Sequence, residues 1–209
     1  MARKRRKARK RRSYHHGNLR ETLLGAARKL IAERGPAGFT LVEAARAAGV
    51  SPAAPYRHFK DRNALLAQVA KDGFTEFGHR VSAGMRNNPR RTFEHMGSAY
   101  LAFAREEPGF YQAMFSSPEG VGAKAGRKNF DALRAAIANV LGKGRTKAET
   151  RLLALQIWAF THGIVSLAAT GQLRRDVAPL KVLKTGTKAL ILGSTGRVQA
   201  STRLVSKKR

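Results

Sequence analysis

Six histidines and 13 acidic residues are the side chains of this 209-residue chain that could hold a metal ion or move a proton. None of the histidines stands at a metal-ligand spacing from the carboxylates, and no Ser, His and Asp occur in a recognisable catalytic context. The absence of cysteine excludes disulfides, thiol catalysis and Cys-ligated zinc. A loose dinucleotide fingerprint at residues 120–125 follows no strand pattern. We therefore expect no catalytic residue, no metal and no cofactor.

Cationic side chains dominate the remaining chemistry. Lys and Arg number 41 against 13 Asp and Glu, which gives a formal net charge of +28. A solvated surface does not need such an excess, whereas a polyanionic partner, either nucleic acid or an anionic membrane, explains it. Residues 1–12 hold nine of these cations, but the other 32 still outnumber the acidic residues by 19. The basic character therefore extends to the folded body.

The basic arm, residues 1–13, has two interpretations. It is either a disordered solubilising tail or an arm that follows DNA phosphates and enters the minor groove. No apolar segment follows the arm, so we predict no signal peptide. No stretch approaches 18 apolar residues, so we also predict no membrane span.

The elements that would position such cations are most clearly encoded in residues 39–66. Thr40 is a candidate N-cap, and Glu43 stands three positions later, as a capping box requires. The next apolar residues recur at helical spacing, and they are Leu41, Ala44, Ala45 and Ala48. Gly49 stands where this helix would end in a left-handed residue.

A second helix is predicted directly after the glycine turn. Ser51 is its expected N-cap, and Pro52 would occupy its first position, where a missing N–H costs nothing. Pro55 removes one early hydrogen bond and biases Ala54 away from helical geometry, so we expect an irregular start. Two short helices joined by a tight turn indicate a helix-turn-helix, whose second helix enters a major groove of DNA.

From about Tyr14 to Phe77 the chain resembles the TetR family of bacterial transcription repressors. The shared pattern is Phe39-Thr40, Ala48-Gly49-Val50-Ser51, Tyr56-Arg57-His58-Phe59, Lys60, Arg62 and Leu65-Leu66. Asn63 departs from it, because the family often carries Glu at this position.

The resemblance implies how the helix-turn-helix region would contact double-stranded DNA. Tyr56, His58 and Lys60 would contact phosphates, and the hydroxyl or amide of Thr40 would contact another. Base reading would fall to the segment after the turn, where the methyl groups of two alanines favour thymine. The complete predicted set is Thr40, Ser51, Pro52, Ala53, Ala54, Tyr56, Arg57, His58 and Lys60.

The rest of the chain predicts an all-α fold, with a three-helix DNA-binding domain followed by a helical-bundle domain for dimerisation and ligand binding. Helices are expected over residues 17–34, from 61 past 77, and over 90–106, 130–141, 146–171 and 177–192, with a short aromatic segment at 110–115. The predicted domains are residues 14–72 and 73–193, and we expect the basic tail 194–209 to be disordered.

Residues 158–163 resemble a C-terminal domain type found on some members of this family. His162 lies in an apolar helix and needs a polar partner. It is either a satisfied core histidine or part of the lining of an effector pocket. The walls of such a pocket would be Phe103, Tyr111, Met114 and Trp158.

Two faces that mix small and apolar residues suit a dimer seam. The first comprises Leu152, Leu155, Gln156, Ala159, Gly163, Ser166 and Leu167, and the second comprises Leu180, Leu183, Thr187, Leu190 and Ile191. In the family that the chain resembles, the last two long helices pair across a two-fold axis into a four-helix bundle.

Together these features predict a cytoplasmic, nucleoid-associated regulator that binds a palindromic operator as a homodimer and responds to a small-molecule effector. Two alternatives stay open. One is an architectural protein of the nucleoid type, which would use its charge to bind DNA without sequence preference. The other is an enzyme built on a helical bundle, although no residues of the sequence indicate a particular reaction.

Overall fold

The computed structural model describes residues 19–87, 92–116, 123–142, 144–174 and 176–206. Within these ranges the chain forms eight α-helices and one short 3-10 helix, with no strand, so the all-α prediction is confirmed. The elements are α1 (Leu19–Arg34), α2 (Leu41–Ala47), η1 (Ala54–Arg57), α3 (Arg62–Asn87), α4 (Thr92–Glu106), α5 (Pro108–Ser116), α6 (Ala123–Leu141), α7 (Lys147–Ala169) and α8 (Pro179–Ser206).

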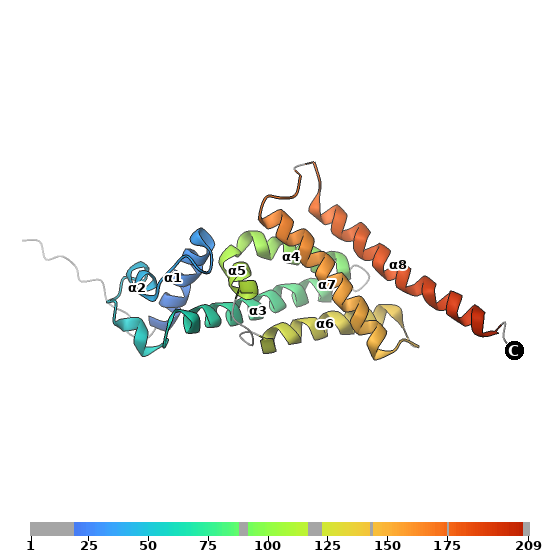
Figure 1. Cartoon of the computed structure of the whole chain (residues 1–209), viewed down its shortest axis with the longest axis horizontal. Coiled ribbons are helices and arrows are strands. Elements are labelled where there is room, and N and C mark those ends of the chain that lie inside the picture. The colour runs from blue at the N-terminus through green and yellow to red at the C-terminus, as the bar shows by residue number, and fades with distance from the viewer. Residues whose placement is uncertain (1–18, 88–91, 117–122, 143, 175, 207–209) are drawn as a thin grey trace, which may run out of the picture.

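The head consists of α1, α2, η1 and the first turns of α3 (Figure 1). Its core is made by the apolar stripe of each helix, including Leu23 and Ile31 of α1 and Leu65 of α3, all of which are fully buried. Burying a side chain of this size contributes about 1.5–3 kcal/mol. Ala113 of α5 belongs to the same cluster, so the head core continues into the body.

Helix α3 runs from the head into the body, where it packs on α4, α5 and α6 (Figure 1). The predicted domain boundary near Asp72 lies within this continuous helix. Two further apolar clusters stabilise the body. One centres on Phe103 and Val165, and the other on Ile137 and Ile157. Helix α8 leaves the body on the side away from the head (Figure 1).

Two predicted helix boundaries were wrong. Helix α6 begins at Ala123 and not near Phe130, and α8 continues to Ser206 and not to residue 192. The expected disordered tail therefore starts as helix. Polar and basic residues did not signal these extensions, because these stretches lack the apolar stripe from which helices were predicted. The glycines of the loose dinucleotide fingerprint lie outside the described residues, and its last three residues open α6.

Helix α7 is more apolar than we expected. By length and composition alone it is long enough to cross a membrane, with a mean hydropathy of 1.6 over 18 residues, and only 22% of that window is buried in the chain. The prediction that no such stretch exists was wrong. Helix α7 packs on α4, α6 and α8, which accounts for one of its faces. Its other apolar side chains, such as Leu152 and Leu155, are exposed.

Candidate DNA interface and body cavity

The turn in the head has the predicted geometry. The Thr40 hydroxyl accepts a hydrogen bond from the Glu43 amide at 3.1 Å, and the Glu43 carboxylate accepts one from the Thr40 amide at 2.8 Å. Gly49 has a φ of +71°, a left-handed conformation that glycine adopts without a Cβ clash. The capping box and the glycine turn are therefore both confirmed.

The segment after the turn differs from the predicted second helix. It forms a single 3-10 turn, η1, whose N-cap is Ala53 without a side-chain hydrogen bond. The carbonyl of Ser51 accepts a hydrogen bond from the Ala54 amide at 3.0 Å. The prediction that Ser51 caps an α-helix starting at Pro52 was wrong, whereas the irregular start is confirmed. Pro55, which has no amide hydrogen, accounts for it.

The side chains predicted to contact DNA lie mostly on the solvent side of η1 and its flanks. Tyr56 is 58% exposed, whereas Pro55 and Phe59 on either side of it are buried in the head. These two buried residues hold the segment in place, so its exposed residues form one surface. The exposed members are Thr40, Ser51, Pro52, Ala53, Tyr56, Arg57, His58 and Lys60, and Ala54 is half-buried.

Thr40 is less available to DNA than its exposure indicates. Its amide and its hydroxyl both donate to the Glu43 carboxylate, at 2.8 and 2.9 Å. The hydroxyl hydrogen bond is the main cause that lowers the pKa of Glu43, and Arg34 pairs with this carboxylate at 3.0 Å. A phosphate contact by Thr40 therefore requires one of its donors to leave an ionised carboxylate.

Sequence reasoning missed the residues that hold the start of α3 against the head. Asp61 caps α3, because its Oδ1 accepts from the Ala64 amide at 2.7 Å. Arg62 donates to the carbonyl of Pro36 at 2.9 Å and lies over the ring of Phe39 at 5.7 Å. An Asp directly before residues with helical periodicity predicts an N-cap, so Asp61 could have been identified from the sequence. The contact between Arg62 and Pro36 joins residues 26 positions apart, and no local pattern predicts it.

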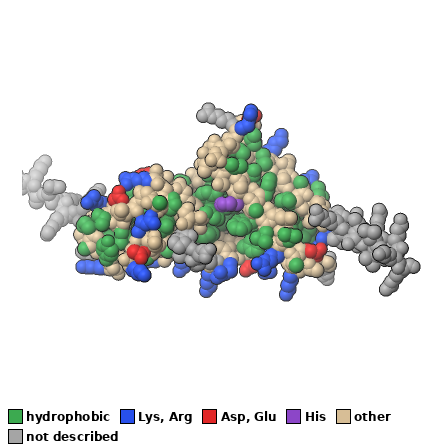
Figure 2. Space-filling model, in the orientation of Figure 1, with side chains coloured by type: hydrophobic (Ala, Val, Ile, Leu, Met, Phe, Trp, Pro, Cys, Tyr) green, Lys and Arg blue, Asp and Glu red, His purple; other side chains and the backbone are tan. Residues whose placement is uncertain are grey.

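Cations gather on the surface of the head and along one edge of the molecule. Figure 2 shows Lys and Arg side chains over the head and along the lower edge of the body in that view. Hydrophobic side chains gather on the face of the body, in the region where Figure 1 places α7. On this face the body therefore carries apolar side chains over its middle and cations at its edges.

A cavity of about 440 Å³ lies within the body, between α3, α4, α5, α6, α7 and α8. This volume is typical of small-molecule sites, and so is a lining of mostly apolar and aromatic side chains. The aromatic and methionine residues of the lining are Phe74, Phe77, Phe93, Met96, Tyr100, Met114, Phe115, Phe130 and Trp158.

The structure places the five predicted pocket residues in two layers. Met114 and Trp158 line the cavity. Phe103, Tyr111 and His162 belong to the layer of side chains directly behind the lining. The α3 and α6 walls of the cavity were not predicted, because only the folded chain brings residues near 77, 130 and 158 together.

His162 has a polar partner in the core, as the core-histidine interpretation requires. The hydroxyl of Tyr100 lies 2.9 Å from His162 Nδ1, and the ring of Phe115 lies 4.3 Å from the imidazole. Burial lowers the pKa of His162 and raises the pKa of Tyr100, so this contact is a hydrogen bond between a neutral imidazole and a neutral phenol. Tyr100 itself lines the cavity, so His162 supports one of its walls.

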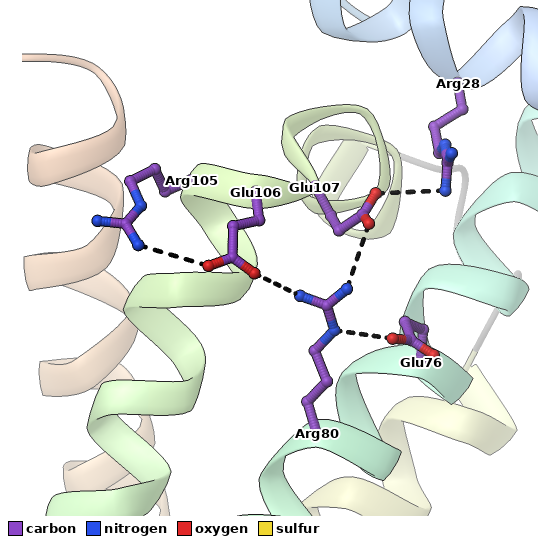
Figure 3. Close-up of polar contacts among 6 residues, drawn as sticks. All are labelled: Arg28, Glu76, Arg80, Arg105, Glu106 and Glu107. Carbon is purple, nitrogen blue, oxygen red and sulfur yellow. Dashed lines mark hydrogen bonds and ion pairs between the residues drawn. The ribbon is translucent and has the colours of Figure 1, made fainter.

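Charged side chains connect the head to the body through the turn between α4 and α5 (Figure 3). Arg80 of α3 pairs with Glu76 at 2.7 Å, with Glu106 at 2.9 Å and with Glu107 at 3.2 Å. Glu107 also pairs with Arg28 of α1 at 3.2 Å, which links this network to the head. Only the pair of Glu76 and Arg80, at i and i+4 on one helix, could have been read from the sequence.

Helix α5 touches the head and the cavity at once. Near its start, Gly109 packs so tightly on α1 that a Cβ would overlap with the carbonyl oxygen of Arg28. The guanidinium of Arg28 lies over the ring of Phe110, at 4.7 Å from the centroid. Near its end, Met114 and Phe115 line the cavity. One short helix therefore bridges the two candidate sites.

Comparisons with known proteins identify both halves of the chain. Residues 23–69 match the model of the bacterial regulatory proteins of the tetR family, and residues 93–188 match that of the tetracyclin repressor-like C-terminal domain. No curated protein matches the chain.

Several solved structures share the fold. A protein with unknown function from Rhodococcus sp. RHA1 is 29% identical, with a TM-score of 0.73, and the match covers 87% of this chain and 98% of that one. The fatty acid degradation regulator FadR from Bacillus halodurans is 16% identical (TM-score 0.67; 85% and 97% covered). The transcriptional regulator FadR from Bacillus subtilis, solved in complex with stearoyl-CoA, is 15% identical (TM-score 0.66; 82% and 97% covered).

The two matched regions contain the helix-turn-helix in the head and most of the cavity-forming helices of the body. The chain therefore belongs to the TetR family of DNA-binding transcriptional regulators.

Proposed function

We propose that this protein is a ligand-responsive repressor that binds a palindromic operator as a homodimer. The observation that carries the proposal is the position of α5, which lines the cavity at one end and packs on the head at the other. A ligand that displaces Met114 or Phe115 would move the helix that holds Arg28 and α1. Ligand binding would thereby reorient the head, and this shift between two conformations would release DNA.

The exposed face of α7 supports dimerisation. Leu152 is 58% exposed, and Leu155, Gln156, Ala159 and Leu167 of the predicted seam are also exposed. Large exposed apolar patches mark interaction sites, so an apolar face on a helix of this hydropathy favours burial against another protein surface in solution. The predicted α8 seam needs a correction, because Leu183 and Thr187 are buried in their own chain and line its cavity. The proposed seam therefore rests on α7, and Leu180 and Leu192 are large hydrophobic residues of α8 that are also exposed.

Two heads related by a two-fold axis would read two half-sites. One head per chain and a self-complementary α7 face favour an operator with palindromic symmetry, because protein and DNA symmetry match in such complexes. Tyr56, His58 and Lys60 would hold the phosphates, and the short η1 segment would face the bases. A single helical turn offers few side chains to base edges, so DNA shape would supply part of the specificity.

The cavity supports an apolar effector. Its walls are mainly aromatic and aliphatic, and its volume suits a small molecule. The Bacillus subtilis FadR, which has a similar fold, was solved in complex with stearoyl-CoA, a ligand with a long apolar chain. The chain itself would recognise a ligand largely by burial of apolar surface, with Tyr100 and Thr161 as neutral polar contacts.

Footprinting of the purified protein on the DNA that flanks its own gene tests the proposal. We expect a protected site with two-fold symmetry, and an affinity that exceeds binding to random DNA at least 1000-fold (about the low end of specific binders) at physiological salt. Equal competition by random DNA would contradict the repressor function and would favour a non-specific architectural protein. A second footprint after addition of a cavity ligand should show release.

A further inference from the structure

The charge of the cavity lining is one-sided. Among the described residues, its charged members are Arg127 of α6 and Arg151 of α7, and no carboxylate lines it. The remaining walls are apolar, aromatic or neutral polar. A cation beside a low-dielectric wall attracts an anion more strongly than the same cation in open water.

These two arginines also differ from the other arginines of the body. Arg80, Arg134 and Arg145 each contact a carboxylate within 3.6 Å. For Arg127 and Arg151, the part of the chain that the structure describes supplies no carboxylate at ion-pair distance. Within the described residues, therefore, no carboxylate competes with an external anion for either guanidinium group.

The two arginines lie at the rim of the cavity, so an anion bound to either of them would also lie at the rim. Both residues are exposed, and the apolar walls lie beyond them. Arg127 stands one helical turn before Phe130, and Arg151 stands two turns before Trp158 on the same face of α7. Phe130 and Trp158 are in edge contact, with ring centroids 6.3 Å apart. Because α6 and α7 pack with opposite directions, the two arginines flank this aromatic pair from opposite sides.

We propose that the effector is an amphipathic anion, with an apolar body in the cavity and a carboxylate or another acidic group paired with a guanidinium group of the lining, that of Arg127 or that of Arg151. The inference rests on the proposed ligand-binding function and adds the ligand's charge to it. An apolar cation of the same size would be repelled at the rim. An uncharged analogue would fill the same walls but lose the charge-assisted hydrogen bonds to the guanidinium groups.

Two fluorescent probes that differ by one charge test the proposal. The anion 1-anilinonaphthalene-8-sulfonate and its neutral parent N-phenyl-1-naphthylamine share one aromatic body. Each would be titrated into the full-length protein and into the R127Q/R151Q double variant. We expect the variant to lose roughly tenfold in affinity for the sulfonate, as the removal of charge-assisted hydrogen bonds predicts, and less than twofold for the neutral probe.

Matched controls separate the rim from the overall charge of the protein. The K128Q/K147Q double variant removes one exposed cation from each of the same two helices without touching the cavity lining. It should leave both affinities within about twofold. Ala132 lines the cavity, so A132W should fill it and weaken both probes.

The outcomes distinguish this inference from the function on which it rests. Equal loss of the sulfonate in the R127Q/R151Q and K128Q/K147Q variants would overturn the anion site, and so would an unchanged affinity in the former. In both cases the ligand-binding function would still be supported, provided that the neutral probe binds the wild-type protein and that A132W weakens this binding. A neutral probe that does not bind the wild-type protein, or that A132W leaves unaffected, would contradict the cavity as a ligand site, and the anion inference with it.

Discussion

At the residue scale, the packing of a single glycine ties the head to the body. Gly109, the second residue of α5, packs against the backbone of α1, and a Cβ there would overlap with the Arg28 carbonyl oxygen. We predict that Gly109→Ala lowers the free energy of unfolding by about 1–3 kcal/mol, because backbone atoms cannot yield as a side chain can. Urea unfolding measures this. The control is Gly25→Ala in α1, where a Cβ meets nothing within 4 Å and a gain of about 0.5–1 kcal/mol is expected.

Glu149 should make part of the stability of the protein dependent on pH. It completes a capping box with Thr146 at the start of α7, and the amide and hydroxyl of Thr146 lower its pKa from 4.5. A lowered pKa in the folded state stabilises the protein above pH 4.5, and this contribution is lost as pH falls through the folded-state pKa. Glu149→Gln keeps a hydrogen-bonding oxygen but removes the charge.

Urea unfolding of wild type and Glu149→Gln between pH 7 and pH 3 measures this contribution. We expect the wild type to be more stable at neutral pH and the two curves to converge at acidic pH. Glu33→Gln, which removes an exposed carboxylate near the end of α1, serves as the control. A constant difference across the whole pH range would contradict the role assigned to the Glu149 charge.

At the scale of elements, Arg80 holds three carboxylates from α3 and the α4–α5 turn together. Each pair is partly exposed, so each contributes only about 0.2–1 kcal/mol. We predict that Arg80→Gln lowers the free energy of unfolding by about 1 kcal/mol at low salt, and by less at high salt because of screening.

Arg105→Gln is the matched control for this prediction. Arg105 is 80% exposed in its side chain and contacts Glu106 alone among the carboxylates of the described residues, at 3.4 Å. We expect a change within about 0.5 kcal/mol. Calorimetry or urea unfolding of the two variants at two salt concentrations compares them, and equal effects would show that the junction network adds no stability.

At the scale of the whole molecule, the α7 face should determine the oligomeric state. Leu152→Glu places a charge on the proposed seam, and an uncompensated charge in an apolar interface is costly. Sedimentation should show the variant as a monomer at micromolar concentration, with weakened operator binding. Val140→Glu changes a similarly exposed residue, on α6, and should remain dimeric. A wild-type protein that sediments only as a monomer, with and without DNA, would refute the dimer.

The basic arm gives a second prediction for the whole molecule. Deleting residues 1–12 removes nine cations, and each phosphate contact they make adds about 0.9 to the slope of log affinity against log salt. We expect the truncated protein to bind DNA more weakly, with a flatter slope but the same operator preference. Binding measured from about 50 to 200 mM salt compares the two proteins. Identical slopes would identify the arm as a solubilising tail.

The sequence by itself determined the features that local chemistry controls. The capping box of Thr40 and Glu43, the left-handed Gly49 and the irregular segment at Pro55 each depend on residues within a few positions. Helical periodicity likewise identified the all-α class, and the head pattern identified the family. These predictions were confirmed because hydrogen bonds and steric limits between near neighbours act in any fold.

Only the tertiary structure decided which distant residues meet. Leu183 and Thr187 looked like a dimer seam in sequence, yet the packing of α8 on α4 and α7 buries them beside the cavity. The pairing of Glu107 with both Arg28 and Arg80 joins α1 and α3 through the α4–α5 turn, and no periodicity encodes it. Helical spacing defines a face but not its partner, because burial against the same chain and burial against a second chain favour the same apolar residues.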